Sequence, residues 1–184
     1  MNKLILDLDL TLVNTSIQED LKSQIKLSKD KGEKYRLWKE VYKLIPFCIL
    51  YDGVEELFDY IRNNNIPTII VSNNSNRLIK KFIDYYKIPI IDFVGRFTLN
   101  RFKPIIKPSP LPIMKGVEIL GGNDGVKILS VGNETIDIES SNKAMVQSVL
   151  CTWGNTEEYN SNAIQHCTPN YIIHHPIELI QLLQ

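Results

Sequence analysis

Two acidic residues one position apart, Asp7 and Asp9, follow a short apolar segment near the beginning of the chain. That segment, residues 4–6, has the composition of a buried strand, so both carboxylates should lie at the edge of a hydrophobic core. A carboxylate in such a place loses hydration free energy unless a cation or hydrogen bonds compensate, and two neighbouring carboxylates also repel each other. A bound metal ion would relieve both effects, so the pair predicts a cation site.

Three further clusters supply residue types that could work with this pair. The first is Ser72 and Asn73, which follow an apolar segment. The second is Lys107, which begins a Lys-Pro-Ser-Pro stretch, and the third is Asn133 with Asp137 after another apolar segment. Phosphoryl transfer needs a nucleophile, a proton donor for the leaving group and positive charge over the transferring oxygens, and these residue types can fill those parts. Each cluster taken alone also has a structural explanation, because a Ser-Asn turn often caps a helix and a loop lysine is usually solvated.

The elements expected around these residues are short apolar strands that alternate with amphipathic helices. Strands are predicted near residues 4–6, 67–71, 91–94, 126–131, 149–152 and 171–173. Helices are predicted near residues 54–61, 78–83, 113–120 and 177–183, and after residue 137. This alternation is typical of an α/β fold with a doubly wound, mostly parallel sheet, in which ligands bind beyond the carboxyl ends of the strands. Asp7, Ser72 and Gly132 should all lie at that edge.

Residues 14–51 depart from the alternation and predict a small inserted helical cap. A capping box at residues 16–19 begins one helical stripe, Gly32 marks a break in a charged run, and a proline ends a second stripe. The cap carries eight Lys or Arg residues against five Asp or Glu, which mildly favours an anionic substrate, although solvated helix faces explain these charges equally well. The predicted α/β core then comprises residues 1–13 and 52–184.

The motifs and their order resemble those of the haloacid dehalogenase-like (HAD) hydrolases. The matching features are Asp-x-Asp-x-Thr from Asp7 to Thr11, an apolar strand followed by Ser72, Lys-Pro-x-Pro from Lys107, and Gly132 followed by Asp137. Residues 51–57 and 152–154 also resemble the phosphoglycolate-phosphatase-like branch. The helical cap is reduced relative to that branch, so the resemblance does not carry over the substrate.

The resemblance implies a Mg²⁺-dependent phosphatase that acts on a small phosphorylated metabolite. Asp7 would form an aspartyl-phosphate, and Asp9 would protonate the leaving alcohol and then activate the attacking water. The implied catalytic residues are Asp7, Asp9, Ser72 and Lys107. The implied phosphate-binding residues are Thr11, Ser72, Asn73 and Lys107. The implied metal ligands are Asp7, Asp9 through its backbone carbonyl, Asn133 and Asp137.

Asn133 is a departure from the family pattern, which usually has Gly-Asp-x-x-x-Asp at this place. Mg²⁺ prefers hard oxygen ligands and retains waters, so an asparagine carbonyl can still ligate it or orient a water. Asp7, Asp9 and Asp137 would supply the remaining negative charge, so we expect metal binding to survive. Glu134 is an alternative acid, although in an extended segment its side chain would point away from that of Asn133. The alternative function is a weakly active or inactive HAD-like protein that binds a phosphorylated ligand or a protein partner.

Bulk composition narrows the class of protein. Of the 184 residues, 21 are Lys or Arg and 21 are Asp or Glu, so nothing indicates a nucleic-acid or membrane-surface protein. The three cysteines are widely spaced with no Cys-x-x-Cys pair, which indicates neither a disulfide framework nor a zinc site and favours a cytoplasmic location. No apolar run reaches the length of about 20 residues that spans a membrane. The expected partner is a small phosphorylated substrate, and the oligomeric state is not predicted.

Overall fold

The computed structural model describes residues 2–122 and 125–184. Its centre is a six-stranded sheet in the order β5-β4-β1-β6-β7-β8, and each neighbouring pair of strands is parallel. The strands are β1 (Lys3–Leu6), β4 (Thr68–Val71), β5 (Asp92–Val94), β6 (Ile128–Gly132), β7 (Gln147–Cys151) and β8 (Tyr171–Ile173). The chain begins in the middle of the sheet, extends it on one side and then crosses to the other. The predicted doubly wound, mostly parallel α/β fold is therefore confirmed.

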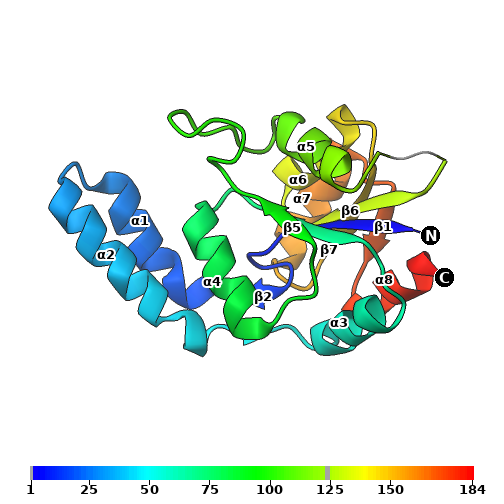
Figure 1. Cartoon of the computed structure of the whole chain (residues 1–184), viewed down its shortest axis with the longest axis horizontal. Helices are drawn as coiled ribbons and strands as arrows, with labels where there is room; N and C mark the ends of the chain where they lie inside the picture. The colour runs from blue at the N-terminus through cyan, green and yellow to red at the C-terminus, as the bar shows by residue number, and fades with distance from the viewer. Residues whose placement is uncertain (1, 123–124) are drawn as a thin grey trace.

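Helices cover both faces of the sheet, as Figure 1 shows. Leu4 and Leu6 of β1 face a core formed with α3 (Val54–Asn63), α4 (Asn76–Tyr86) and α8 (Pro176–Leu183). Ile5 points to the opposite face, where α5 (Leu111–Ile119) packs. Beside α5 lie α6 (Thr135–Lys143) and α7 (Glu157–Cys167), which pack on β7. Since both faces are buried, the strands consist of nearly continuous apolar runs.

The inserted segment forms a pair of helices that projects beyond one edge of the sheet (Figure 1). It contains the 3₁₀ turn η1 (Ser16–Gln18), α1 (Glu19–Leu27), α2 (Lys31–Lys43) and the 3₁₀ turn η2 (Ile45–Phe47). The predicted break at Gly32 was wrong by a few residues, because Asp30 caps α2 by accepting a hydrogen bond from the backbone N–H of Glu33 at 2.6 Å. Gly32 therefore lies inside the first turn of α2. The division into a core and a 14–51 cap stays a prediction.

Two features were not expected from the sequence. A short antiparallel ribbon of β2 (Val13–Asn14) and β3 (Ile49–Leu50) joins the two ends of the inserted segment. The helix α7 was also missed, although Thr156 caps it by accepting a hydrogen bond from the N–H of Tyr159. The ribbon holds the entry and exit of the inserted segment together, next to the end of β1.

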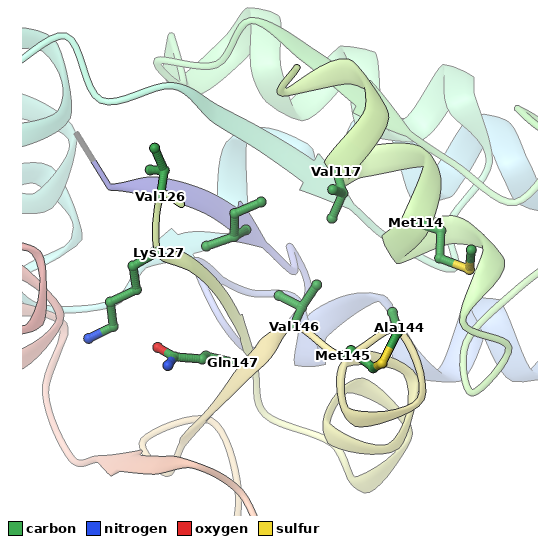
Figure 2. Close-up of a pocket in the computed structure, with 9 residues that line it drawn as sticks. Met114, Val117, Val126, Lys127, Ala144, Met145, Val146 and Gln147 are labelled. Carbon is green, nitrogen blue, oxygen red and sulfur yellow. The ribbon is translucent and has the colours of Figure 1, made fainter. Parts of the chain in front are cut away.

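A mainly apolar hollow lies away from the predicted site residues. It has a volume of about 380 Å³ and sits at the amino ends of β6 and β7, as Figure 2 shows. Its lining is mainly aliphatic, with Met114, Val117, Val146 and Met145 prominent. Nothing in this lining can perform the predicted chemistry, so the candidate site must be sought at the opposite end of the strands.

Two expectations from composition can be compared with the structure. The three cysteines, Cys48, Cys151 and Cys167, are free and buried. Within the described part of the chain, none of the helices has the length and apolar character needed to cross a bilayer.

Candidate active site

The carboxyl ends of three adjacent strands bring the predicted residues together. β1 pairs with β4 on one side and with β6 on the other, so Asp7, Ser72 and Asn133 leave neighbouring strands at the same edge. Backbone hydrogen bonds extend this alignment past the strands, with the N–H of Asp7 donating to the carbonyl of Val131 at 2.9 Å. The parallel topology, which the apolar runs produce, is therefore what positions the site.

Lys107 links the strand ends through its buried ammonium group. Its Nζ donates to Asp7 Oδ1 at 2.6 Å and to the carbonyl of Val71 at 3.0 Å, and it also forms a close ion pair with Asp137. Only 4% of Lys107 is exposed. Asn73 holds the lysine backbone from both sides, because its Oδ1 accepts from the Lys107 N–H at 2.8 Å and its Nδ2 donates to the Lys107 carbonyl at 3.2 Å. The Asn73 side chain thus positions Lys107, while phosphate binding by Asn73 stays a prediction.

The charges in this cluster influence one another strongly. Burial raises the pKa of Asp7 to about 7, against the opposing effect of the Lys107 ammonium. Burial alone would lower the pKa of Lys107, yet Asp137 and Asp7 together raise it above its ordinary value. The lysine therefore stays charged and favours the ionised form of Asp7. With two carboxylates around one ammonium, the cluster keeps an excess of negative charge that another cation could neutralise.

Asp137 is placed by the beginning of α6. Its Oδ2 accepts a hydrogen bond from the N–H of Glu134 at 2.9 Å, while its Oδ1 pairs with Lys107. Gly132 makes this possible, because a Cβ on that residue would collide with the Asp137 carboxyl group. Asp137 is thus held as a partner of Lys107, and its role as a metal ligand stays a prediction.

Thr11 lies between Asp7 and Asn133. The Thr11 hydroxyl lies 3.1 Å from Asn133 Oδ1 and 3.5 Å from Asp7 Oδ2, so these two oxygens converge on it. Asn133 Nδ2 donates to Asn155 Oδ1 at 2.9 Å, and Asn155 Nδ2 donates back to the Asn133 carbonyl. Thr11 is 1% exposed and supports Asp7 and Asn133 from behind the cavity, and its contact with phosphate stays a prediction.

Asp9 lies on the opposite side of the site, toward the inserted helices. Its Oδ1 accepts from Lys22 Nζ of α1 at 3.2 Å, and its Oδ2 accepts from Asn74 Nδ2. Lys22, Asn74 and Asn155 were not identified from the sequence. The excess of basic residues in the inserted segment was the one signal for Lys22, and no pattern pointed to the two asparagines.

The predicted residues surround a small cavity of about 110 Å³. Its lining consists of Asp7, Asp9, Leu10, Ser72, Asn73, Lys107, Asn133, Glu134, Ile136 and Asp137. Acids, an ammonium group and a hydroxyl therefore face one enclosed space at the strand ends. Such a space suits a phosphoryl group, which needs a nucleophile on one side and positive charge around its oxygens.

Several oxygen atoms of the site are of the kind that Mg²⁺ prefers, and the metal ligands stay a prediction. Within residues 2–122 and 125–184, no three His, Cys, Asp or Glu side chains lie close enough to hold a metal ion by themselves. Mg²⁺ is commonly held by only one or two carboxylates together with waters. Asp7 Oδ2 and Asn133 Oδ1, which converge on the Thr11 hydroxyl, provide one carboxylate oxygen and one neutral oxygen. With the predicted Asp9 carbonyl, they make an oxygen-rich set of the kind that Mg²⁺ prefers.

Known proteins are similar to most of this chain. A family model described as haloacid dehalogenase-like hydrolase matches residues 16–151. A phosphoglycolate phosphatase of Aquifex aeolicus (strain VF5) is 29% identical over 137 residues, which are 72% of this chain and 58% of that protein. A phosphoglycolate phosphatase of Neisseria gonorrhoeae is 28% identical over 60% of this chain and 46% of its own length. The chain thus spans about half the length of these curated relatives.

Solved structures show the same fold. A predicted phosphoglycolate phosphatase from Haemophilus somnus 129pt superimposes with a TM-score of 0.78 at 20% identity, covering 100% of this chain and 98% of the other. A haloacid dehalogenase-like hydrolase from Streptococcus pneumoniae gives a TM-score of 0.77 at 17% identity, with 100% and 99% covered. At such low identities the likeness concerns the fold alone.

Proposed function

Because the chain belongs to the haloacid dehalogenase-like hydrolase family, as its motifs predicted, we propose that it is a Mg²⁺-dependent phosphatase acting on small phosphate monoesters. The observation that carries the proposal is the buried Lys107 ammonium between Asp7 and Asp137, at the end of β1 and beside Ser72. A lysine held in this way favours the charged form of the nucleophile and supplies positive charge to a phosphoryl group. We also infer a cytoplasmic location, which stays a prediction.

The first half-reaction uses Asp7 as nucleophile. One oxygen of its carboxylate attacks phosphorus, and the bond from phosphorus to the ester oxygen breaks. Asp9 gives a proton to that oxygen, so the leaving group departs as a neutral alcohol. Lys107 and the Ser72 hydroxyl stabilise the charge that develops on the phosphoryl oxygens.

The second half-reaction returns Asp7 to its free form. A water attacks the phosphorus of the aspartyl-phosphate, Asp9 takes the proton from that water, and the bond between phosphorus and Asp7 breaks to release inorganic phosphate. A bound Mg²⁺, held by the predicted ligands Asp7, Asn133, Asp137 and the Asp9 carbonyl, would supply further positive charge to the phosphoryl oxygens in both halves.

Replacing the nucleophile is the direct test. We expect the wild type to hydrolyse an aryl phosphate only with Mg²⁺, and Asp7→Asn to lose about 10³-fold or more in kcat, as is typical for loss of a nucleophile. Asp52→Asn is the matched control, since Asp52 has a fully solvated carboxylate. Rapid acid quenching and mass spectrometry should find a phosphoryl group on Asp7 in the wild type. Equal activity in Asp7→Asn and the wild type would refute the proposal.

A second candidate is a family member that binds phosphorylated ligands without turnover. Asn133 is the observation that favours it, because the charge usually present at this position is missing. In that case the wild type should bind inorganic phosphate in calorimetry, yet release none from a broad panel of esters. Asn133→Asp would then gain hydrolysis, whereas an active enzyme should hydrolyse part of the panel without it.

A further inference from the structure

Both oxygens of the Asp9 carboxylate accept hydrogen bonds from other parts of the molecule. One oxygen accepts from Lys22 of α1 at 3.2 Å, and the other accepts from Asn74, which follows β4. Asp9 also lines the cavity, so an ester that reaches its carboxylate must share those oxygens with the two donors. A leaving-group oxygen that comes within hydrogen-bonding distance of Asp9 therefore competes with these donors for its position.

Lys22 is the donor that can leave. Asn74 is anchored through its backbone, whose N–H donates to Ser72 Oγ at 3.3 Å and whose carbonyl accepts from the N–H of Arg96 at 2.9 Å. Lys22 has a flexible side chain on the inserted helix, and among the described residues Asp9 is the one acceptor within hydrogen-bonding distance of its ammonium group. Arrival of an ester at Asp9 would therefore release the lysine first.

A released ammonium group needs a new anion. The Lys22 side chain is only 20% exposed, so water would hydrate the separated charge incompletely. The ester oxygen that Asp9 protonates must lie at the Asp9 carboxyl group, and Lys22 Nζ is 3.2 Å from that carboxyl group. The atoms of the leaving group nearest to the ammonium are therefore those one or two bonds beyond the ester oxygen.

We propose that Lys22 is a specificity-determining residue that exchanges Asp9 for an anionic group on the leaving alcohol, close to the ester oxygen. This inference rests on the proposed function for the role of Asp9. The favoured substrates are then phosphate monoesters of short hydroxy acids, whose carboxylate is separated from the ester oxygen by one or two carbons. Esters of neutral alcohols release Lys22 without giving it a partner, so they react less well.

A pair of esters of similar size tests the exchange. Phosphoglycolate carries a carboxylate one carbon from the ester oxygen, and ethyl phosphate carries a methyl group there. We expect Lys22→Met to lower the ratio of kcat/KM for phosphoglycolate to kcat/KM for ethyl phosphate by about 10- to 100-fold, the usual value of a hydrogen bond to a charged group. Lys22→Arg should restore most of the ratio. Lys29→Met, in the exposed loop after α1, should leave the ratio as in the wild type.

A binding measurement separates this inference from the proposed function. In the Asp7→Asn background, calorimetry should show that Lys22→Met weakens phosphoglycolate binding by the same factor, with inorganic phosphate affected less than threefold. If the wild type binds with this discrimination but hydrolyses neither ester, the phosphatase proposal fails and the role of Lys22 stands. If Lys22→Met changes both esters equally in turnover and in binding, the role of Lys22 is refuted while the phosphatase proposal stands.

Discussion

The two aspartates of the first motif lie in very different surroundings. On the core side, the group of Asp7, Lys107 and Asp137 has side chains that are 3–11% exposed, with a distance of 2.6 Å between Lys107 Nζ and Asp7 Oδ1. On the cap side, the group of Asp9, Lys22 and Asn74 includes an ion pair of 3.2 Å whose side chains are 20% and 28% exposed. The core-side group rests on strand ends, whereas the cap-side group depends on an inserted helix.

This difference separates the residues that act on the phosphoryl group from the residues that can contact the rest of the substrate. The nucleophile and the charge around the phosphoryl group must be held rigidly, and a buried ion pair on three strand ends does that. A buried ion pair is compatible with a stable fold only while both partners are present. If one partner is removed, the charge of the other stays buried without compensation. The Lys22–Asp9 pair is more exposed and involves a flexible lysine, so it contributes less to stability and can be exchanged for a substrate contact. The core-side group should therefore dominate stability and rate, and the cap-side group should dominate selectivity.

The largest expected effect comes from removing the core-side ammonium. Lys107→Met leaves the buried carboxylates of Asp7 and Asp137 facing each other, which should lower the free energy of unfolding by about 3–5 kcal/mol. The loss of positive charge should also lower kcat by about 10²–10³-fold. Denaturant unfolding and steady-state kinetics with an aryl phosphate measure the two effects.

Lys103→Met is the control for this substitution. Lys103 is exposed in the same loop, so its loss should change the free energy of unfolding by no more than about 0.5 kcal/mol. Similar losses in the two variants would mean that the core-side group is not the stabilising unit described above.

A second test displaces Asp137 without removing any charge. In Gly132→Ala, the new methyl group would collide with the Asp137 carboxyl group and push it away from Lys107. We expect the free energy of unfolding to fall by about 1–3 kcal/mol, as is usual for overpacking. The misplacement should lower kcat by about 10²-fold. Normal kinetics in this variant would show that the Asp137 contact to Lys107 is dispensable.

The sequence predicted the core-side residues because their positions follow from topology. Apolar runs specify the strands, parallel strands direct their carboxyl ends to one edge, and residues directly after them must meet there. Asp7 and Ser72 were found in this way, and the flanking prolines distinguished Lys107 from Lys103. The doubly wound sheet was predicted for the same reason, with strand boundaries shifted by only a few residues.

The cap-side contacts could not be predicted, because they depend on how separate elements pack. Nothing in the spacing of Lys22 shows that α1 reaches Asp9, since exposed lysines are common on helices. Asn155, which follows β7, likewise forms hydrogen bonds with Asn133, which follows β6. The helix α7 was missed because its sequence has few apolar residues and so no clear helical period. The break at Gly32 was misplaced because the Asp30 cap outweighed the low helix propensity of glycine.

Asn133 lies between the two groups and offers a smaller effect that depends on the metal. In Asn133→Asp, a carboxylate oxygen replaces the amide nitrogen that donates to Asn155 Oδ1, so two oxygens would face each other. Without Mg²⁺ we expect the free energy of unfolding to fall by about 1–2 kcal/mol. With Mg²⁺ the added charge should strengthen binding, so the metal should raise the melting temperature more than it does in the wild type.

Thermal unfolding with and without Mg²⁺ measures this difference, and Asn63→Asp is its control. That substitution adds the same charge to an exposed residue at the end of α3, so Mg²⁺ should affect it as it affects the wild type. An equal response to Mg²⁺ in both variants and in the wild type would argue against Asn133 as a ligand position.

The smallest expected effect concerns the attachment of the inserted segment to the core. The Tyr86 hydroxyl of α4 donates to the carbonyl of Ile45 at 3.1 Å and to that of Cys48, and burial raises the pKa of Tyr86 to about 12. Tyr86→Phe should lower the free energy of unfolding by about 0.5–1.5 kcal/mol at neutral pH. A raised folded-state pKa gives stability that is complete below about pH 10, the unfolded value, and is lost as the pH rises toward 12. The difference between wild type and variant in denaturant unfolding should therefore shrink across that window, whereas Tyr85→Phe, which alters a half-exposed neighbour, should show no such trend.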